Sequence, residues 1–262
     1  MISKNKLKLI KSLARKKIRK KENLFLAEGG KTVTEILKSD IRIRELYATP
    51  DFLEYNEKLS EGAEQLVMVT NDELKKASLL REPQNCIAIC EMPAPADLPQ
   101  KMQGLSFFSD GIQDPGNLGT IVRTCDWFGF NYLFCSHDTA DIYNPKVVQA
   151  SMGSFCHIPV IYTDFPRVHQ IAGASQIPVF GAFTDGENIY RSKLPQQAMI
   201  VLGNEGKGIR EEIAAHIRNR LSIPSFHAGT SGVESLNVAV AAAVFCSEFR
   251  RNSENQAIQN GS

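Results

Sequence analysis

Two apolar runs in the second half of the chain, IPVFGAF (177–183) and AMIVLGN (198–204), contain almost no polar side chains before they end. A strand that is apolar on both faces must be covered on both, which is typical of parallel sheets in α/β proteins. Shorter strand-like runs at 105–110, 131–136 and 158–163 alternate with helical segments in the same region. The pattern predicts an α/β domain that binds its ligand at the carboxyl ends of the strands.

A first β/α series precedes this one. Its alternation indicates a small, parallel-rich sheet flanked by helices, with strands over 24–29, 43–49, 65–70 and 86–92. Thr70 and Glu73 have capping-box spacing for the helix that follows them.

Three prolines in EMPAPADLPQ (91–100) separate the two series and predict a linker. The residues after 251 are polar and are expected to be disordered. We therefore expect four regions, namely a basic arm with a first domain (1–95), a linker end (96–104), a second domain (105–251) and a polar tail (252–262).

The composition excludes several classes of protein. With 43% hydrophobic residues the 262-residue chain has enough apolar material for a core, and no apolar run reaches the ~18 residues of a membrane span. The basic N-terminus lacks the apolar segment of a signal peptide, which favours a cytoplasmic protein. Six cysteines without CxxC spacing and five scattered histidines predict reduced core thiols and no metal site.

Residues 1–21 contain ten of the 30 Lys and Arg residues and no acid, so the rest of the chain has 20 basic against 29 acidic residues. A basic arm on an acidic body is typical of docking onto a polyanion. A solvated helix, or one that binds calmodulin or a membrane surface, has a similar pattern. We take the arm as an RNA-binding segment, with contacts from Lys16, Lys17, Arg19 and Lys20.

Three segments of the second series place glycines and polar residues directly after an apolar strand. In the first, strand 105–110 precedes a constrained turn, where Asn117 is a candidate cap for a helix over 117–129 that carries Arg123. In the second, IVLGNEGKGIR (200–210), the glycines permit close approach of the backbone to a ligand. The spacing in this second segment is that of neither a P-loop nor a GxGxxG motif.

The third segment joins the strand LSIP to a long helix over 234–251. Ser231 and Glu234 have capping-box spacing, and Ser235 and Asn237 are poor helix formers, which indicates a role for their side chains. Taken singly, the three segments also fit a surface arginine, a glycine-rich turn and a capped core helix.

Together the three segments resemble the motifs of SPOUT-class methyltransferases, in particular the SpoU branch of RNA ribose 2′-O-methyltransferases. NLGTIVR (117–123), LGNEGKG (202–208) and IP…ESLNVAVAAA (223–243) appear in the family's order, and the likeness covers about residues 105–250. FLAEG (25–29), behind a lysine-rich helix, resembles the ribosomal-protein-like RNA-binding domain that often precedes this catalytic domain.

The resemblance implies an α/β fold in two domains, the second with a C-terminal trefoil knot, an exception to the rule against knots. It implies a homodimer that uses S-adenosylmethionine. The catalytic residues that it implies are Arg123, Asn117, Glu205, Ser235 and Asn237. The implied cofactor-binding residues are Leu202, Gly203, Asn204, Gly206, Ile223, Pro224, Ser235 and Leu236.

The reaction requires a ribose hydroxyl to lose its proton while it attacks the methyl group in line. Arg123 is a poor general base, so two roles stay open for it. One is phosphate-assisted deprotonation, and the other is RNA binding, in which it holds an RNA phosphate by two hydrogen bonds and stabilises the developing alkoxide. Glu205 is a candidate to orient Arg123 or a group of a partner subunit. Ribosomal RNA is the expected substrate. Transfer RNA, a non-catalytic RNA-binding factor and a nucleotide hydrolase are the alternatives, and the last lacks a phosphate-binding loop.

Overall fold

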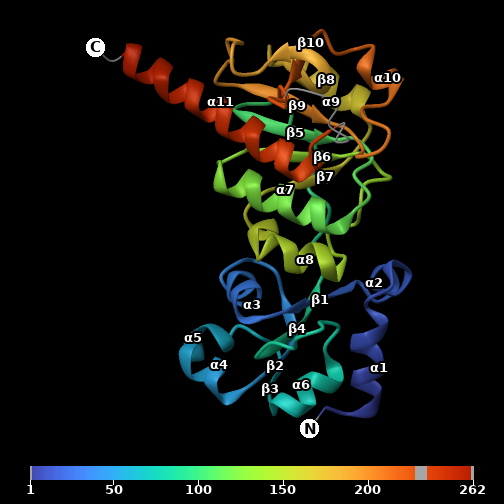
Figure 1. Cartoon of the computed structure of the whole chain (residues 1–262). Coiled ribbons are helices and arrows are strands. Elements are labelled where there is room, and N and C mark those ends of the chain that lie inside the picture. Colours follow the sequence, from blue (N-terminus) through green and yellow to red (C-terminus); the bar gives the residue numbers. More distant parts are fainter. Residues whose placement is uncertain (1, 228–234, 261–262) are drawn as a thin grey trace. The chain divides into compact units, whose positions relative to one another are not determined.

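The computed structural model of the chain describes residues 2–227 and 235–260 (Figure 1). The chain forms two compact units. Unit 1 consists of Met1–Pro95 and Asp141–His157, and unit 2 of Ala96–Ala140 and Ile158–Ser262. The second domain that the sequence predicts, 105–251, is therefore interrupted by a segment that belongs to unit 1. Within the described ranges, no helix has the length and apolarity to cross a membrane.

Unit 1 contains a four-stranded sheet in the order β1-β4-β2-β3. β4 pairs antiparallel with both of its neighbours, and only β2 and β3 pair parallel, so the prediction of a parallel-rich sheet is wrong. The reason lies in β4, whose first five residues are all buried and which therefore takes a central position. The strands are β1 (Leu24–Glu28), β2 (Ile43–Ala48), β3 (Leu66–Met68) and β4 (Cys86–Glu91).

The helices of unit 1 bury apolar side chains against this sheet. The basic arm forms two helices, and its Ile10 and Leu13 are fully buried in the core. The capping box of Thr70 and Glu73 is confirmed. The helices from the first 95 residues are α1 (Lys4–Ser12), α2 (Lys16–Glu22), α3 (Gly30–Leu37), α4 (Pro50–Tyr55), α5 (Glu57–Ser60) and α6 (Asn71–Ala77).

The segment 141–157 completes the core of unit 1. It contains α8 (Pro145–Ser151) and a short 3₁₀ turn, η1 (Ser154–Cys156). The ring of Phe25 on β1 lies 4.9 Å from that of Tyr143 and 5.9 Å from that of Phe155, measured between centroids. The core of unit 1 therefore includes residues that lie more than forty positions after the end of its first segment at Pro95.

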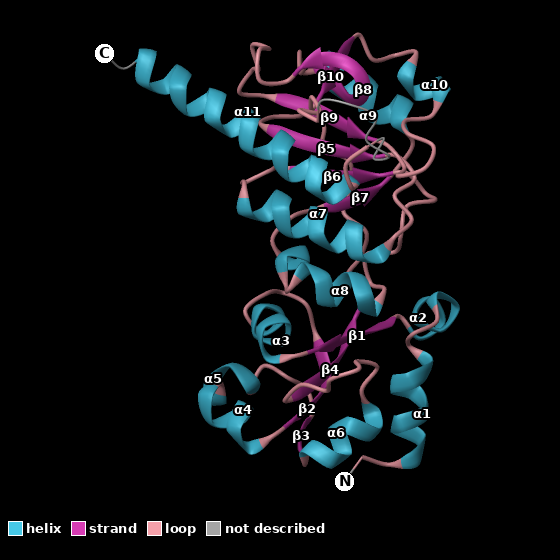
Figure 2. Cartoon of the chain, viewed as in Figure 1, coloured by secondary structure: helices cyan, strands magenta, loops and turns pink. Residues whose placement is uncertain are grey.

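Unit 2 contains a six-stranded sheet, entirely parallel, in the order β10-β8-β9-β5-β6-β7 (Figure 2). The two apolar runs noted in the sequence form β8 and β9, next to each other within the sheet. The strands are β5 (Leu105–Ser109), β6 (Tyr132–Cys135), β7 (Val160–Tyr162), β8 (Val179–Asn188), β9 (Ala198–Leu202) and β10 (Asn219–Ser222).

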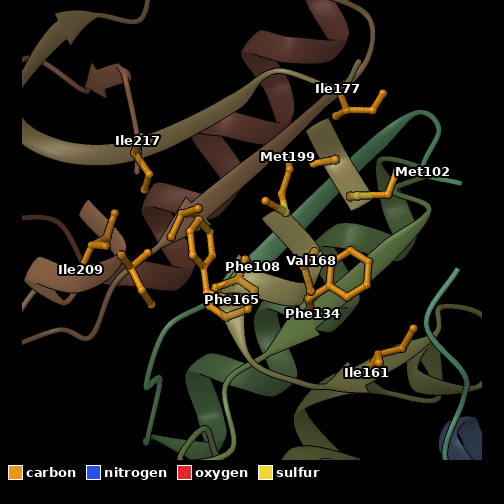
Figure 3. Close-up of a cluster of buried hydrophobic side chains, with 13 residues drawn as sticks. Met102, Phe108, Phe134, Ile161, Phe165, Val168, Ile177, Met199, Ile209 and Ile217 are labelled. Atoms are coloured by element: carbon orange, nitrogen blue, oxygen red, sulfur yellow. The ribbon is translucent and has the colours of Figure 1, made fainter. Parts of the chain in front are cut away.

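Two apolar layers hold the helices of unit 2 to this sheet. On one face, Phe108, Phe134 and Met199 meet side chains of α9 such as Phe165 and Val168 (Figure 3). Elsewhere α7 and α11 lie side by side along the sheet (Figure 1). The helices are α7 (Pro115–Trp127), α9 (Phe165–Ala174), α10 (Glu211–Ala214) and α11 (Val238–Asn260).

The final helix and the cysteines also bear on the sequence predictions. α11 continues to Asn260, so the expected disorder from residue 252 is not observed over 252–260. Neither glycine nor proline interrupts these residues, which allows the helix to continue. Five cysteines are buried free thiols, and Cys156 is half-buried; the five are Cys86, Cys90, Cys125, Cys135 and Cys246.

Candidate active site

Helix α7 presents the side chain of Asn117 at the carboxyl end of the unit 2 sheet. The helix begins two residues earlier than predicted because Asp114, not Asn117, is the N-cap, and its carboxylate accepts the Asn117 backbone N–H at 2.8 Å. Pro115 at the first helical position suits this start. The Asn117 side chain is therefore released from capping and is available for other contacts.

A chain of three side chains joins the three motif segments. The Asn237 amide donates to Asn117 Oδ1 at 3.0 Å, and Asn117 Nδ2 donates to Glu205 Oε1 at 2.7 Å. Asn237 also caps α11, since its Oδ1 accepts the backbone N–H groups of Ala239 and Val240. Segments that are up to 120 residues apart in sequence thus meet at one point.

Arg123 lies in the same helix as Asn117 and is exposed. Its guanidinium has no hydrogen bond or ion pair with the side chains that the structure describes. The expectation that Glu205 orients Arg123 is not met within the chain, because the Glu205 carboxylate is bound by Asn117. Arg123 is therefore a cation with its hydrogen-bonding capacity available for a ligand.

The loop of residues 203–209, here called the 203–209 loop, is organised by Asn204. Its Nδ2 donates to the Gly111 carbonyl at 2.7 Å, and its Oδ1 accepts the backbone N–H groups of Gly206 and Lys207. Asn204 and Gly208 also exchange two backbone hydrogen bonds. A Cβ atom at Gly203 would lie 2.3 Å from the backbone of Gly208, so only glycine fits there.

The cofactor-binding residues predicted from the resemblance occupy different surroundings. Leu202 is buried, Gly203, Asn204, Ile223 and Pro224 are half-buried, and Gly206, Ser235 and Leu236 are exposed. A Cβ atom at Gly206 would meet nothing closer than 3.7 Å, so a ligand can approach the backbone there. The polar loop and the apolar side chains of Ile223 and Leu236 fit a ligand with both polar and apolar parts.

The sequence analysis did not identify two candidate functional residues, Asp110 and Arg210. Asp110, directly after β5, is 1% exposed and forms an ion pair with Arg210 at the end of the 203–209 loop. The hydrogen bonds to Asp110 raise the pKa of Arg210. The signal in the sequence was an acid directly after an apolar strand and a base directly after a glycine-rich segment. Ser231 and Glu234, the proposed capping box, lie outside the described residues.

The basic arm in unit 1 divides into exposed and buried cations. Lys16, Lys17 and Lys20 are exposed, as an RNA contact requires. Arg19 does not fit its predicted role, because it is 1% exposed and donates to the carbonyls of Leu13 and Ala14 and to Asp141. Its neighbours in the helix meet solvent, whereas Arg19 supports the core of unit 1.

Among the described residues, no group of three or more His, Cys, Asp or Glu side chains could hold a metal ion. The candidate site therefore consists of amide, carboxylate and guanidinium groups with a glycine-rich backbone.

Comparison with known proteins gives matches over nearly the whole chain. The profile of the SpoU rRNA Methylase family matches residues 104–247, and that of the MRM3-like substrate binding domain matches residues 4–88. The 23S rRNA (guanosine(2553)-2′-O)-methyltransferase RlmP of Bacillus subtilis is 33% identical over 94% of this chain and 96% of its own length.

Solved structures show the same likeness. A protein from Porphyromonas gingivalis assigned to the TrmH family of RNA methyltransferases is 40% identical, with a TM-score of 0.83 over 96% of this chain and 99% of its own. An AdoMet-bound rRNA methyltransferase from Sinorhizobium meliloti is 25% identical, with a TM-score of 0.82 over 96% and 97% of the two chains.

Proposed function

Because the chain belongs to the SpoU rRNA methylase family, we propose that it transfers a methyl group from S-adenosylmethionine to a ribose 2′-hydroxyl of RNA, with ribosomal RNA as the substrate. The observation that carries this proposal is the hydrogen-bonded chain from Asn237 through Asn117 to Glu205. It brings the three family motifs together at the start of α7, the helix that carries the exposed Arg123.

The cofactor is assigned to the 203–209 loop and the segment after β10. Gly203, Asn204 and Gly206 with Leu202 offer backbone groups, while Ile223, Pro224, Ser235 and Leu236 line the remainder. When bound, S-adenosylmethionine supplies an electrophilic methyl group on a sulfonium. The glycines of this loop allow the close approach that such a ligand needs.

Arg123 is assigned to the RNA. Its planar guanidinium can hold a phosphate by two parallel hydrogen bonds and can stabilise the negative charge that develops on the attacking ribose oxygen. The proton of that hydroxyl leaves to the phosphate that Arg123 holds or to water, since a guanidinium is not a base at neutral pH. The hydrogen bonds from Asn117 to Glu205 and Asn237 fix the start of the same helix, and Ser235 lies two residues before Asn237 at the entry of α11.

Several further features belong to this proposal. The exposed Lys16, Lys17 and Lys20 of unit 1 bind the RNA backbone. The protein acts as a homodimer in the cytoplasm, and the C-terminal part of unit 2 forms a trefoil knot.

The decisive experiment uses a ribosomal RNA fragment whose target nucleotide is either ribose or 2′-deoxyribose. We expect the deoxy form to bind equally well but to accept no methyl group, because only the nucleophile has been removed. The product from the ribose form should resist alkaline cleavage at that position. Methyl transfer to the deoxy form would assign the reaction to a base and refute the proposal.

Two rival functions are distinguished by two other measurements. In a thermal unfolding assay, S-adenosylmethionine would not stabilise a non-catalytic RNA-binding factor. For an enzyme, the ligand at 100 times its Kd raises the free energy of unfolding by ~2.7 kcal/mol. A transfer RNA enzyme would methylate transfer RNA in preference to ribosomal RNA from cells that lack this protein.

A further inference from the structure

One residue, Asp110, contacts the chain on both sides of the 203–209 loop, through its backbone N–H on one side and its carboxylate on the other. The backbone N–H of Asp110 donates to the carbonyl of Leu202 at 2.8 Å, at the start of the loop. Its Oδ2 accepts the backbone N–H of Arg210 at 2.8 Å, and its Oδ1 accepts Arg210 Nε at 2.7 Å, at the end of the loop. The second guanidinium nitrogen, Nη2, also pairs with Oδ1.

The burial of this pair is asymmetric. Asp110 is 1% exposed, whereas 42% of the Arg210 side chain is accessible. A buried carboxylate is costly unless donors compensate for the lost water, and here Arg210 supplies every donor to the side chain that the structure describes. A hydrophobic residue after β5 would serve the sheet equally well, so the sheet alone does not explain Asp110.

The residue next to Asp110 is fixed to the same loop. The Gly111 carbonyl accepts the Asn204 amide at 2.7 Å, and the Gly111 N–H donates to Ser136 Oγ at 2.8 Å. The residues at the end of β5 therefore contact Leu202 just before the loop, Asn204 within it and Arg210 just after it. The interior of the loop, from Glu205 to Lys207, is exposed and free to face a ligand.

We propose that Asp110 and Arg210 are positioning residues that hold the 203–209 loop in its binding conformation before S-adenosylmethionine arrives. This inference rests on the proposed function, because it assigns the loop to that cofactor. Neither side chain needs to touch the cofactor. If the closed loop is populated only in a fraction of molecules, the apparent Kd rises by the inverse of that fraction.

The test uses three variants and one matched control. Asp110→Asn keeps the size and one acceptor but removes the charge, Arg210→Gln removes the guanidinium from a partly exposed position, and the third variant combines both. The control is Asp185→Asn, which breaks another carboxylate–arginine pair of unit 2, the 2.7 Å contact between Asp185 on β8 and Arg220 on β10. The measurements are the Kd for S-adenosylmethionine, the KM for it, and kcat with the cofactor saturating.

We expect each single variant to raise the cofactor Kd and KM about tenfold or more, with kcat at saturating cofactor within about twofold of wild type. The double variant should be little worse than Arg210→Gln alone, because that variant already lacks the ion pair with Asp110 as well as the Arg210 contacts with Asp138 and Glu212. RNA affinity and the Asp185→Asn control should not change. If Asp110→Asn does not fold, Arg210→Gln gives the same answer, since its side chain is partly in solvent.

A second readout does not depend on methyl transfer. In cofactor-free protein, hydrogen exchange at the amides of Gly206 and Lys207 should accelerate in the variants and stay unchanged in the control. Unchanged cofactor affinity and unchanged exchange in both single variants would overturn the inference. Wild-type protein that binds no S-adenosylmethionine would instead refute the proposed function, while faster exchange in the variants would still support the loop-holding role.

Discussion

The replacement Arg19→Ala separates the two roles that a cation in the basic arm can have. Arg19 donates to Leu13 O at 2.8 Å, to Ala14 O at 2.9 Å and to Asp141 at 2.5 Å, and only 2% of its side chain is accessible. Alanine removes all of these donors at once. It also leaves Asp141, itself only 17% accessible, as a poorly hydrated carboxylate without its partner.

The magnitude follows from that burial. Removing one partner of a buried ion pair costs ~3–5 kcal/mol, and we take the lower value because Asp141 retains some access to water. For a unit of about 100 residues, ~3 kcal/mol corresponds to a fall in Tm on the order of 10 °C. The matched control is Lys20→Ala, an exposed neighbour in the same helix, which should change stability by less than ~0.5 kcal/mol.

The assay must distinguish the two units, because a two-domain chain need not unfold in one step. Hydrogen exchange at the amides of β5 and β9 reports on unit 2, because the single tryptophan, Trp127, is 83% exposed in the folded chain and its fluorescence would change little on unfolding. Hydrogen exchange at the amides of β1 and β4 reports on unit 1. We expect Arg19→Ala to accelerate exchange in unit 1 and to leave exchange in β5 and β9 of unit 2 near its wild-type rate.

The salt dependence of RNA binding gives the complementary result. Each lysine that contacts a phosphate of single-stranded RNA adds ~0.7 to the slope of log affinity against log salt concentration. Lys20→Ala should reduce the slope by about that amount, and Arg19→Ala, measured well below its Tm, should not. An Arg19→Ala protein with wild-type stability and a reduced slope would refute the structural role assigned to Arg19.

The remaining predictions concern both units. Arg123→Ala and Arg123→Lys should each lower kcat at least a hundredfold without changing the Kd for S-adenosylmethionine, because a lysine lacks the planar fork; near-normal turnover would remove Arg123 from the reaction. Asp114→Ala should lower the free energy of unfolding by about 1 kcal/mol in a thermal unfolding assay, because the Asn117 N–H loses its acceptor. Asp114→Asn, which keeps an N-cap acceptor, should retain most of the wild-type stability. Burial raises the pKa of Glu28 above its ordinary 4.5, so the folded chain binds a proton at Glu28 more tightly than the unfolded chain does. This contribution to stability is present at low pH and is lost as the pH rises through the raised pKa. The unfolding free energy of wild type minus that of Glu28→Gln should therefore fall as pH rises above 4.5, and a flat difference would contradict the shift.

Patterns of neighbouring residues predicted the helices and strands. The order of strands in the sheet and the burial of single charged side chains depend on residues far apart in the sequence, and these were not predicted. The apolar runs at β8 and β9 and the capping box of Thr70 are properties of neighbouring residues, so they could be found. The central place of β4 depends on pairing with β1, more than sixty residues earlier, which no local pattern encodes.

The same limit applies to single side chains. Arg19 has the sequence context of an exposed cation, and its burial arises from Asp141, which is 122 residues away. The sequence analysis placed the N-cap of this helix at Asn117, but Asp and Asn are both good N-caps, and in the structure Asp114, three residues earlier, is the N-cap. Asp110 and Arg210 were missed because an ion pair across 100 residues has no signature in spacing.

The place of residues 141–157 in unit 1 has a consequence for how the chain is made. A ribosome adds ~5–20 residues per second and releases the N-terminal part first. The chain crosses between the two units at three points, after residues 95, 140 and 157. Unit 1 therefore cannot close its core around Phe25 until Phe155 has emerged, by which time the first two strands of unit 2 have been synthesised. The nascent basic arm lacks Asp141 for the same interval, so Arg19 becomes fixed late although it is among the first residues to leave the ribosome.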